Sequence, residues 1–390
     1  MFDVNVLLFV TNLIIIALCG GIYMIMPQLT RKSYLFGVKI PPEQSNCPEA
    51  MALKRSFVHA WLVGVLLMLA LCVIQFVALR ELTLLATLYL PLLVVPASLA
   101  AFVPNWKKAI RLKEEKGWQV SNALFAETSS SHTRGNLSAL PWIWYALSLA
   151  VIIFTFAAAI VQYPVLPDMI AGHLNADLQP DNWVEKTWLT VLLMPVINVA
   201  TLALMTSVAI IIEKARLQID PTNPRLSFAQ HRVYRKRMGH ALGFLSLTTI
   251  LLVAVCGLPV VFPGSPIWSA HVFWGVIAIM SISTVLLIVV QVKAGQGGCK
   301  VIIDVESDRV ESAKSTAKPT AKSRTRGHGD DKFWIIGMYY YNPDDPAFFV
   351  EDRFGANLGF NYARLPVKIG IAALLIGLIA LYAWLTVLFI

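Results

Sequence analysis

The residue types best able to do chemistry gather in one polar segment, residues 163–188, between two long apolar runs. This segment has four carboxylates, one histidine and one lysine in 26 residues. Four of its polar side chains are close enough in sequence to converge on one point: His173, Asn175, Asp177 and Asp181. Carboxylate and amide oxygens beside an imidazole could hold a divalent cation, or they could receive a cationic peptide.

Three interpretations of this segment stay open. Its prolines and Gly172 favour a shaped turn over a helix, so it could be a hydrogen-bonded external turn without a ligand. It could instead be a ligand-binding loop to which Trp183 and Lys186 also contribute. The third interpretation is a metal site with His173, Asp177 and Asp181 as the candidate ligands, although their spacing matches no recognised metal motif.

The chain contains eight long apolar runs, which polar segments separate. Each run is long enough to cross a hydrocarbon core of about 30 Å as a helix that rises about 1.5 Å per residue. We therefore predict an all-α polytopic membrane protein with eight transmembrane helices. The predicted spans are residues 3–26, 58–79, 82–103, 141–162, 189–212, 240–262, 268–292 and 367–390.

The distribution of basic residues predicts the orientation of these spans. Thirty of the 32 Lys and Arg residues lie in alternate connections, or at the edge of one in the case of Lys368. Cytoplasmic loops carry an excess of Lys and Arg, so these connections are predicted to be cytoplasmic. Both termini and residues 163–188 are then expected outside, in a multi-pass protein of the plasma membrane whose first partner is the lipid bilayer.

Composition limits the other classes of function. A chain with 57% hydrophobic and 14% charged residues is not a soluble globular domain. Its formal charge of +9 follows from the topology, so no nucleic-acid partner is expected. No Asp, Glu, Lys or Arg lies inside a predicted span away from its ends, which disfavours an ion-coupled transporter. We find no catalytic or cofactor-binding motif, and the five cysteines form no CxxC pair, so no cofactor is expected.

The connection before the last run is the only cytoplasmic one large enough to hold a folded element. Residues 293–329 are predicted to form a basic disordered tether, of which residues 312–329 have low complexity, whereas residues 330–366 are dense in aromatic side chains. The motif Asn342-Pro343-Asp344-Asp345-Pro346 is a turn signal between two apolar segments, so we predict a small β-hairpin-like cytoplasmic module. Its candidate functional residues are Trp334, Tyr340, Asn342, Asp344 and Asp345. The other predicted domains are residues 1–140 (three spans), 141–292 (membrane core) and 367–390 (last span).

The external segment resembles the external loop of the SdpI-type membrane domain family, whose pattern is roughly P-x-x-I-x-x-H-x-N-x-x-G-x-P-D-x-W-x-x-K. The matching positions are Pro167, Ile170, His173, Asn175, Pro180, Asp181, Trp183 and Lys186. Leu178 stands where glycine is common in the family. Residues 330–366 are similar to a C-terminal domain of unknown function that ends longer members of this group. The early LFGVKIPPE, which its adjacent prolines predict to be an extended arm, also fits the longer members.

The resemblance implies immunity or sensing. The best-understood members protect against a secreted peptide toxin, and toxin binding lets them sequester a cytoplasmic repressor at the membrane; they are shorter and lack the C-terminal module. We therefore expect a receptor, sensor or immunity-type protein, with a secreted peptide outside and a regulator inside as its candidate partners. The alternative is a membrane hydrolase or transporter that uses the acidic external segment, with or without a metal. We expect a receptor-type function rather than catalysis, because the sequence contains no motif that supplies a nucleophile or a paired acid and base.

Overall fold

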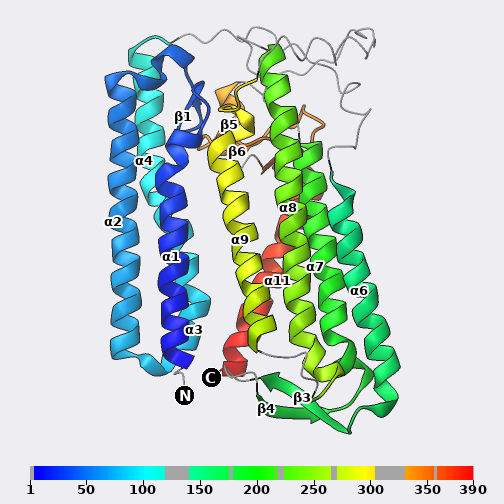
Figure 1. Ribbon diagram of the computed structural model, residues 1–390. Helices are drawn as coiled ribbons and strands as arrows, with labels where there is room; N and C mark the ends of the chain where they lie inside the picture. Colours follow the sequence, from blue (N-terminus) through cyan, green and yellow to red (C-terminus); the bar gives the residue numbers. More distant parts are fainter. Residues whose placement is uncertain are drawn as a thin grey trace, which may run out of the picture. The chain divides into compact units, whose positions relative to one another are not determined.

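The computed structural model describes residues 4–118, 140–174, 179–215, 217, 224–264, 270–303, 330–354 and 358–389. Within these residues the protein is mostly helical, and its strands form four separate antiparallel pairs (Figure 1). The small sheets are too short to form a core of their own, so the helices define the architecture.

Seven helical segments in the described part of the chain are long and apolar enough to cross a membrane. They are Asn5–Leu29, Pro48–Ala78, Arg80–Glu115, Trp142–Val165, Trp188–Lys214, Leu226–Val261 and His271–Ala294. These segments coincide with the first seven predicted spans and indicate a multi-pass membrane protein. The eighth predicted span coincides with α11 (Leu365–Phe389), of which Leu365–Ala380 qualifies only as a shorter apolar helix. Eight crossings and the outside location of the termini therefore stay predictions.

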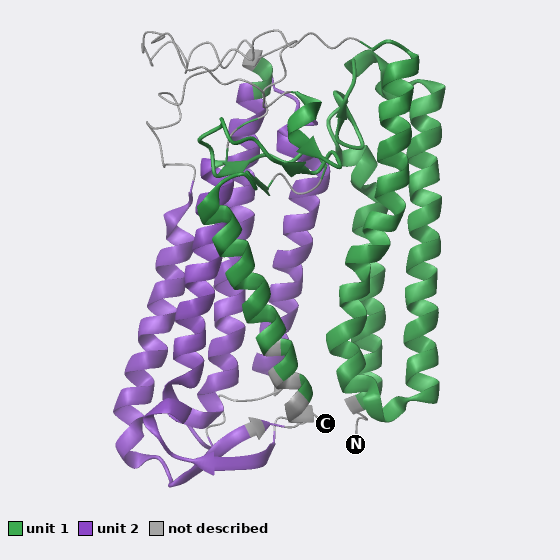
Figure 2. Ribbon diagram, turned by 180° about the vertical axis from the view of Figure 1, so that it is seen from behind, with its two compact units in different colours: residues 1–129, 215–227, 316–390 green, residues 130–214, 228–315 purple. Residues whose placement is uncertain are grey.

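The chain divides into two compact units (Figure 2). The first unit consists of residues 1–129, 215–227 and 316–390, and the second of residues 130–214 and 228–315. The aromatic-rich C-terminal segment therefore belongs to the same unit as the N-terminal helices, although about 300 residues separate them in sequence.

The first unit contains α1 (Val4–Leu29), α2 (Pro48–Ala78), α3 (Thr83–Tyr89), α4 (Val94–Glu115) and α11. Helices α3 and α4 belong to the third span, which the 3₁₀ segment Leu90–Leu93 interrupts. Pro91 lies in this segment, and a proline lacks the amide hydrogen that an α-helix needs at that position. This proline therefore coincides with the break between α3 and α4.

Buried polar contacts join the helices of the first unit. The indole Nε1 of Trp61 in α2 donates a hydrogen bond of 2.8 Å to the carbonyl oxygen of Gly20 in α1. A Cβ atom at Gly20 would lie 2.9 Å from a methyl group of Val65, so glycine permits this close approach of the two helices. Asn12 of α1 donates a hydrogen bond of 3.0 Å to the hydroxyl of Thr87 in α3.

The second unit contains α6 (Trp142–Gln162), α7 (Trp188–Lys214), most of α8 (Pro224–Val261) and α9 (Ala270–Ala294). Hydrogen bonds also cross between these helices, as expected where lipid cannot satisfy polar groups. The amide of Asn198 in α7 donates to the carbonyl oxygen of Ile250 in α8 at 3.2 Å. The hydroxyls of Thr248 in α8 and Ser283 in α9 lie 2.9 Å apart.

The strand pairs correct two predictions. The predicted extended arm is a tight hairpin of β1 (Tyr34–Leu35) and β2 (Val38–Lys39). The cytoplasmic module has two hairpins, β5 (Trp334–Ile335) with β6 (Tyr339–Tyr340) and β7 (Phe349–Val350) with β8 (Gly359–Phe360). The Asn-Pro-Asp-Asp-Pro motif does form a turn, but it joins β6 to β7, which are not paired with each other.

Candidate functional site

The polar segment between α6 and α7 folds into the largest of the strand pairs, β3 (Met169–Leu174) with β4 (Pro180–Glu185). Two register shifts interrupt the pairing. Ala171 pairs with Trp183 and His173 with Asn182, so Gly172 is an extra residue on β3. A Cβ atom at Gly172 would lie 2.6 Å from a methyl carbon of Val184, which explains why this position needs glycine. The prediction of a shaped turn is refined to a bulged hairpin.

One face of the hairpin is buried against helix ends of its own unit. Ile170 is 2% exposed and packs in a cluster with Leu166, and Val184 of the opposite strand lies against the same cluster. Residues from α6, α7 and α8 complete this cluster: Ala159, Val191 and Val261. Because side chains alternate along a strand, the neighbouring residues point away from the helices. The hairpin is therefore fixed to the helical bundle and presents its other face outward.

The outward face combines apolar and acidic side chains. Met169 is 46% exposed and Trp183 is 54% exposed. Asp181 and Glu185 on β4 are also exposed, as is Asp168 just before β3. Negatively charged carboxylates around an exposed aromatic ring favour an extended ligand that carries positive charge.

The base of the hairpin is closed by Lys186, one of the predicted ligand-binding residues. Its ammonium group donates a hydrogen bond of 2.7 Å to the carbonyl oxygen of Leu166 and lies 3.9 Å from the carboxylate of Asp168. It also lies 5.5 Å from the centre of the Tyr163 ring, which stacks on Trp188 at 3.7 Å. These contacts tie the two ends of the hairpin together, so Lys186 has a structural role here.

The remaining predicted residues of this site are only partly placed. Asp181 and Trp183 lie on β4, and the backbone of His173 lies on β3 next to the bulge. Asn175 and Asp177 lie outside the described residues. Within the described residues, no group of three His, Cys, Asp or Glu side chains could hold a metal ion. The metal site therefore stays a prediction that depends on residues beyond that range.

Most of the predicted residues of the cytoplasmic module are buried in a shared hydrogen-bond network. The hydroxyl of Tyr340 donates to the carboxylate of Asp345 at 2.8 Å and accepts from the amide of Asn342 at 3.0 Å. Asn361 donates to the backbone carbonyl oxygens of Asn342 and Asp345. Of the five predicted residues of the module Asp344 is exposed, and its backbone amide donates to the side chain of Asn342. This network closes the turn.

Aromatic packing surrounds the network. The ring of Trp334 is buried 5.1 Å from that of Tyr340. On the other side, the rings of Tyr339 and Tyr362 meet edge to face at 5.5 Å. Burial, and to a lesser extent the neighbouring Tyr339, raises the pKa of the Tyr362 hydroxyl above its ordinary value. The phenol therefore stays neutral over a wide pH range.

Arg353 joins this module to the β1–β2 hairpin. Its guanidinium is fully buried between the rings of Tyr34 and Trp334, at 5.0 and 4.6 Å from their centres. It donates hydrogen bonds to the carbonyl oxygen of Gly37 at 2.9 Å and to the carboxylate of Asp331 at 2.5 Å. A planar guanidinium stacks its faces on aromatic rings while the N–H groups at its edge donate in a fixed fork, so lysine is not an equivalent replacement.

Two further ion pairs connect the module to the N-terminal helices. Arg31, two residues after α1, pairs with Glu351 at 2.9 Å, and both side chains are buried. Lys113 of α4 pairs with Asp331 at 2.6 Å. The ends of α1 and α4 are thereby held to one body with residues 330–354. We call residues 31–40 together with residues 330–354 and 358–364 the cytoplasmic domain, in line with their predicted location.

The two hairpin turns of this domain face each other. Phe36 and Gly37 both have positive φ (48° and 76°), as do Ile336 and Gly337 (54° and 72°), which is the geometry of a type I′ turn. A Cβ atom at Gly37 would overlap the carbonyl oxygen of Gly337, so only glycine allows the contact. The sequence predicts a folded module at residues 330–366 but not its association with the β1–β2 hairpin. The dipeptides Phe-Gly and Ile-Gly, each between apolar residues, were the available signal.

Comparison with known proteins gives one match. The family model described as a domain of unknown function, DUF1648, matches residues 150–199. The matched segment includes much of α6, the whole β3–β4 hairpin and the first part of α7. We find no significant match to a curated protein or to a solved structure. The match thus covers the hairpin together with parts of its two flanking helices.

Proposed function

We propose that this protein is a membrane receptor of the SdpI-like type that recognises an extracytoplasmic peptide through its β3–β4 hairpin. One observation carries the proposal: the hairpin is a sheet of only two strands, anchored by one face, with an exposed tryptophan and carboxylates on the other. In the described part of the chain no third strand pairs with either edge. Such an edge offers unpaired backbone groups to an extended segment of another chain.

The chemistry of the outward face favours a cationic, partly apolar peptide. Backbone pairing along a strand edge supplies affinity with little sequence preference. Trp183 would then provide the anchor, since exposed tryptophans are frequent binding hot spots. Asp168, Asp181 and Glu185 would attract basic residues and speed the encounter.

The location of the hairpin outside the cell rests on the positive-inside distribution of Lys and Arg. The sequence pattern from Pro167 to Lys186 resembles the external loop of SdpI-type proteins, and the DUF1648 match covers the same segment. The cytoplasmic domain would offer a folded surface to a regulator inside the cell. Both features support an immunity or sensing role over the hydrolase and transporter alternatives.

The test measures peptide binding to the full-length protein in lipid nanodiscs. The probes are a panel of synthetic cationic antimicrobial peptides and their scrambled, neutral counterparts. We compare the wild type with the double variant Asp181→Asn, Trp183→Ala. The matched control is Asp344→Asn, Trp142→Ala, which removes another exposed tryptophan and another exposed aspartate.

Loss of a hot-spot tryptophan costs about 2 kcal/mol or more, so the hairpin variant should bind at least about 30-fold more weakly. The control variant should bind like the wild type. Cells that express the wild type should also survive the bound peptides better than cells that express the hairpin variant. If the hairpin variant and the control bind equally, or if no peptide binds, the receptor proposal is wrong. Stoichiometric metal in the purified protein, lost in His173→Ala, would favour the metal-assisted alternative instead.

A further inference from the structure

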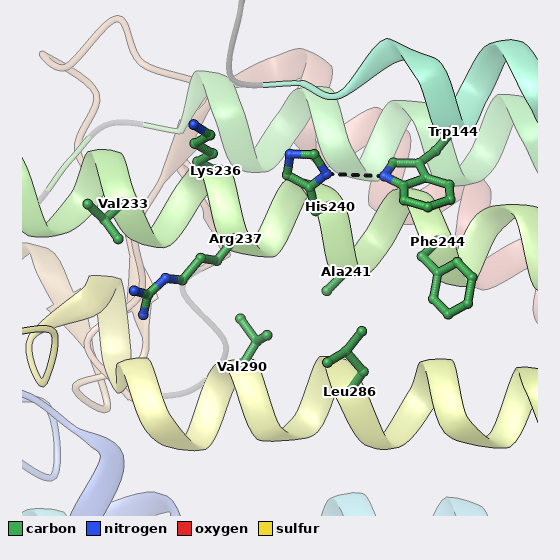
Figure 3. Close-up of a pocket in the computed structure, with 9 residues that line it drawn as sticks. All are labelled: Trp144, Val233, Lys236, Arg237, His240, Ala241, Phe244, Leu286 and Val290. Atoms are coloured by element: carbon green, nitrogen blue, oxygen red, sulfur yellow. Dashed lines mark hydrogen bonds between the residues drawn. The ribbon is translucent and has the colours of Figure 1, made fainter.

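A separate groove lies within the second unit, between α6, α8 and α9 (Figure 3). It has a volume of about 740 Å³. Leu286 and Val290 point into it from α9, toward Ala241 on α8, and Phe244 lies further along α8. Since these side chains carry no polar atoms, the body of the groove suits a hydrocarbon group.

The third wall of the groove is the indole ring of Trp144 from α6. A Cβ atom at Gly243 would lie 2.7 Å from this ring, so the glycine leaves the notch in α8 that the indole occupies. The ring lies 5.3 Å from that of Phe244, and its Nε1 donates a hydrogen bond of 3.2 Å to Nδ1 of His240. Because Nδ1 of His240 accepts this bond, the neutral imidazole carries its proton on Nε2, where it can donate to an anionic oxygen.

One end of the groove is basic. Lys236 and Arg237 are adjacent and exposed on α8, one turn before His240 and Ala241. Within the described chain neither cation takes part in an ion pair. The groove therefore combines two unpaired cations and an imidazole at one end with an apolar body.

This combination is found where the helices leave the apolar layer. Trp144 stands near the start of α6, Val290 near the end of α9, and Lys236 and Arg237 directly before the apolar part of α8. Indole rings favour this interfacial depth, and basic residues beside a span attract anionic lipids. A soluble anion would use the cations but would gain nothing from the apolar body.

We propose that this groove is a binding site for one anionic phospholipid. Arg237 and Lys236 hold the phosphate, the imidazole of His240 donates to a phosphate or glycerol oxygen, and an acyl chain lies along Phe244, Leu286 and Val290. The indole ring of Trp144 forms one wall of the groove, and its hydrogen bond orients the imidazole of His240. The site lies apart in sequence from the β3–β4 hairpin, so this proposal does not depend on the peptide-receptor function.

Native mass spectrometry of the full-length protein in detergent tests the proposal, with phosphatidylglycerol and phosphatidylcholine as the two lipid probes. The variants are Lys236→Gln, Arg237→Gln, which removes the charges, and Leu286→Trp, which fills the groove and keeps them. The matched control is Lys107→Gln, Lys108→Gln, an adjacent exposed pair on α4. Thermal unfolding shows whether each variant is folded. If the charge variant does not fold, Leu286→Trp still tests the proposal.

The wild type should retain phosphatidylglycerol more strongly than phosphatidylcholine. The charge variant should lose about 30-fold in phosphatidylglycerol affinity, at roughly 1 kcal/mol for each cation, while the control keeps its affinity. Leu286→Trp should also lose affinity although all its charges remain. Equal losses in the charge variant and the control, or unchanged binding by Leu286→Trp, would overturn the proposal. Displacement of the lipid by excess inorganic phosphate would also overturn it, because the occupant would then be a soluble anion.

Discussion

Replacement of Arg353 by methionine should release the β1–β2 hairpin from the rest of the cytoplasmic domain. Methionine keeps much of the volume of the buried side chain but removes the guanidinium. The hairpin then loses the hydrogen bond at Gly37 and the cation–π contact at Tyr34, and the module loses the matching contacts at Asp331 and Trp334.

The size of the effect follows from these contacts. Removing one partner of a buried charge pair costs about 3–5 kcal/mol, largely because the other partner stays uncompensated. Here Asp331 keeps Lys113 at 2.6 Å, and its side chain is 32% exposed. We therefore expect the lower end of the range, about 3 kcal/mol. If the hairpin opens locally, this corresponds to roughly 100-fold faster amide exchange.

Hydrogen–deuterium exchange of the full-length protein in nanodiscs measures this directly. The reporter is the peptide that covers residues 33–40, and the internal reference is the β3–β4 hairpin, which lies in the other unit. Arg353→Lys separates charge from shape: it keeps the cation but loses the planar fork, so its exchange should be intermediate.

The matched control is Lys332→Met, because the side chain of Lys332 is 66% exposed and forms an exposed ion pair with nearby Asp330 at 3.3 Å. An exposed pair of this kind contributes about 0–1 kcal/mol, so exchange should hardly change. If the amide hydrogens of residues 33–40 exchange no faster in Arg353→Met than in this control, the guanidinium does not hold the domain together.

Three further predictions concern single positions. Gly172→Ala should destabilise the β3–β4 hairpin by about 1–3 kcal/mol through overlap with Val184, and Val184→Ala in the same chain should restore slow amide exchange of residues 169–185. Tyr340→Phe should cost about 1–3 kcal/mol in thermal unfolding, since buried Asp345 loses the hydroxyl donor. Burial raises the pKa of Tyr362 above the ordinary 10.0, so the stability that its neutral form contributes is complete below pH 10 and is lost as the pH rises further. As the pH rises above 10, the midpoint temperature of thermal unfolding should therefore decrease less in Tyr362→Phe than in the wild type.

The membrane spans could be predicted because a long apolar run is a local property of the sequence. Hydropathy by itself does not give the limits of the helices, since it reports contact with lipid and not helix formation. Helix α8 begins at Pro224, well before the apolar run, and α2 begins at Pro48 behind a capping Cys47. In both cases an amphipathic stretch continues the helix beyond the predicted span.

The candidate site was harder to predict because its geometry depends on pairing and on distant contacts. The prolines and Gly172 indicated a turn, but the bulge arises from the packing of Gly172 against Val184 on the opposite strand. The cytoplasmic domain needs contacts across more than 300 residues, such as Arg353 with Gly37 and Glu351 with Arg31. No pattern within either segment shows which partner it has.

Burial changes how variants of the cytoplasmic domain must be interpreted. Of the five residues first selected in the module, Trp334, Tyr340, Asn342 and Asp345 are buried and support the fold. Asp344 is the exposed one, at the tip of the turn. A regulator that docks on this turn would therefore meet the Asp344 carboxylate, whereas loss of function in a Tyr340 or Asn342 variant would report a disrupted domain. Asp344→Asn, with unchanged exchange at residues 33–40, is consequently the variant that can separate partner binding from folding.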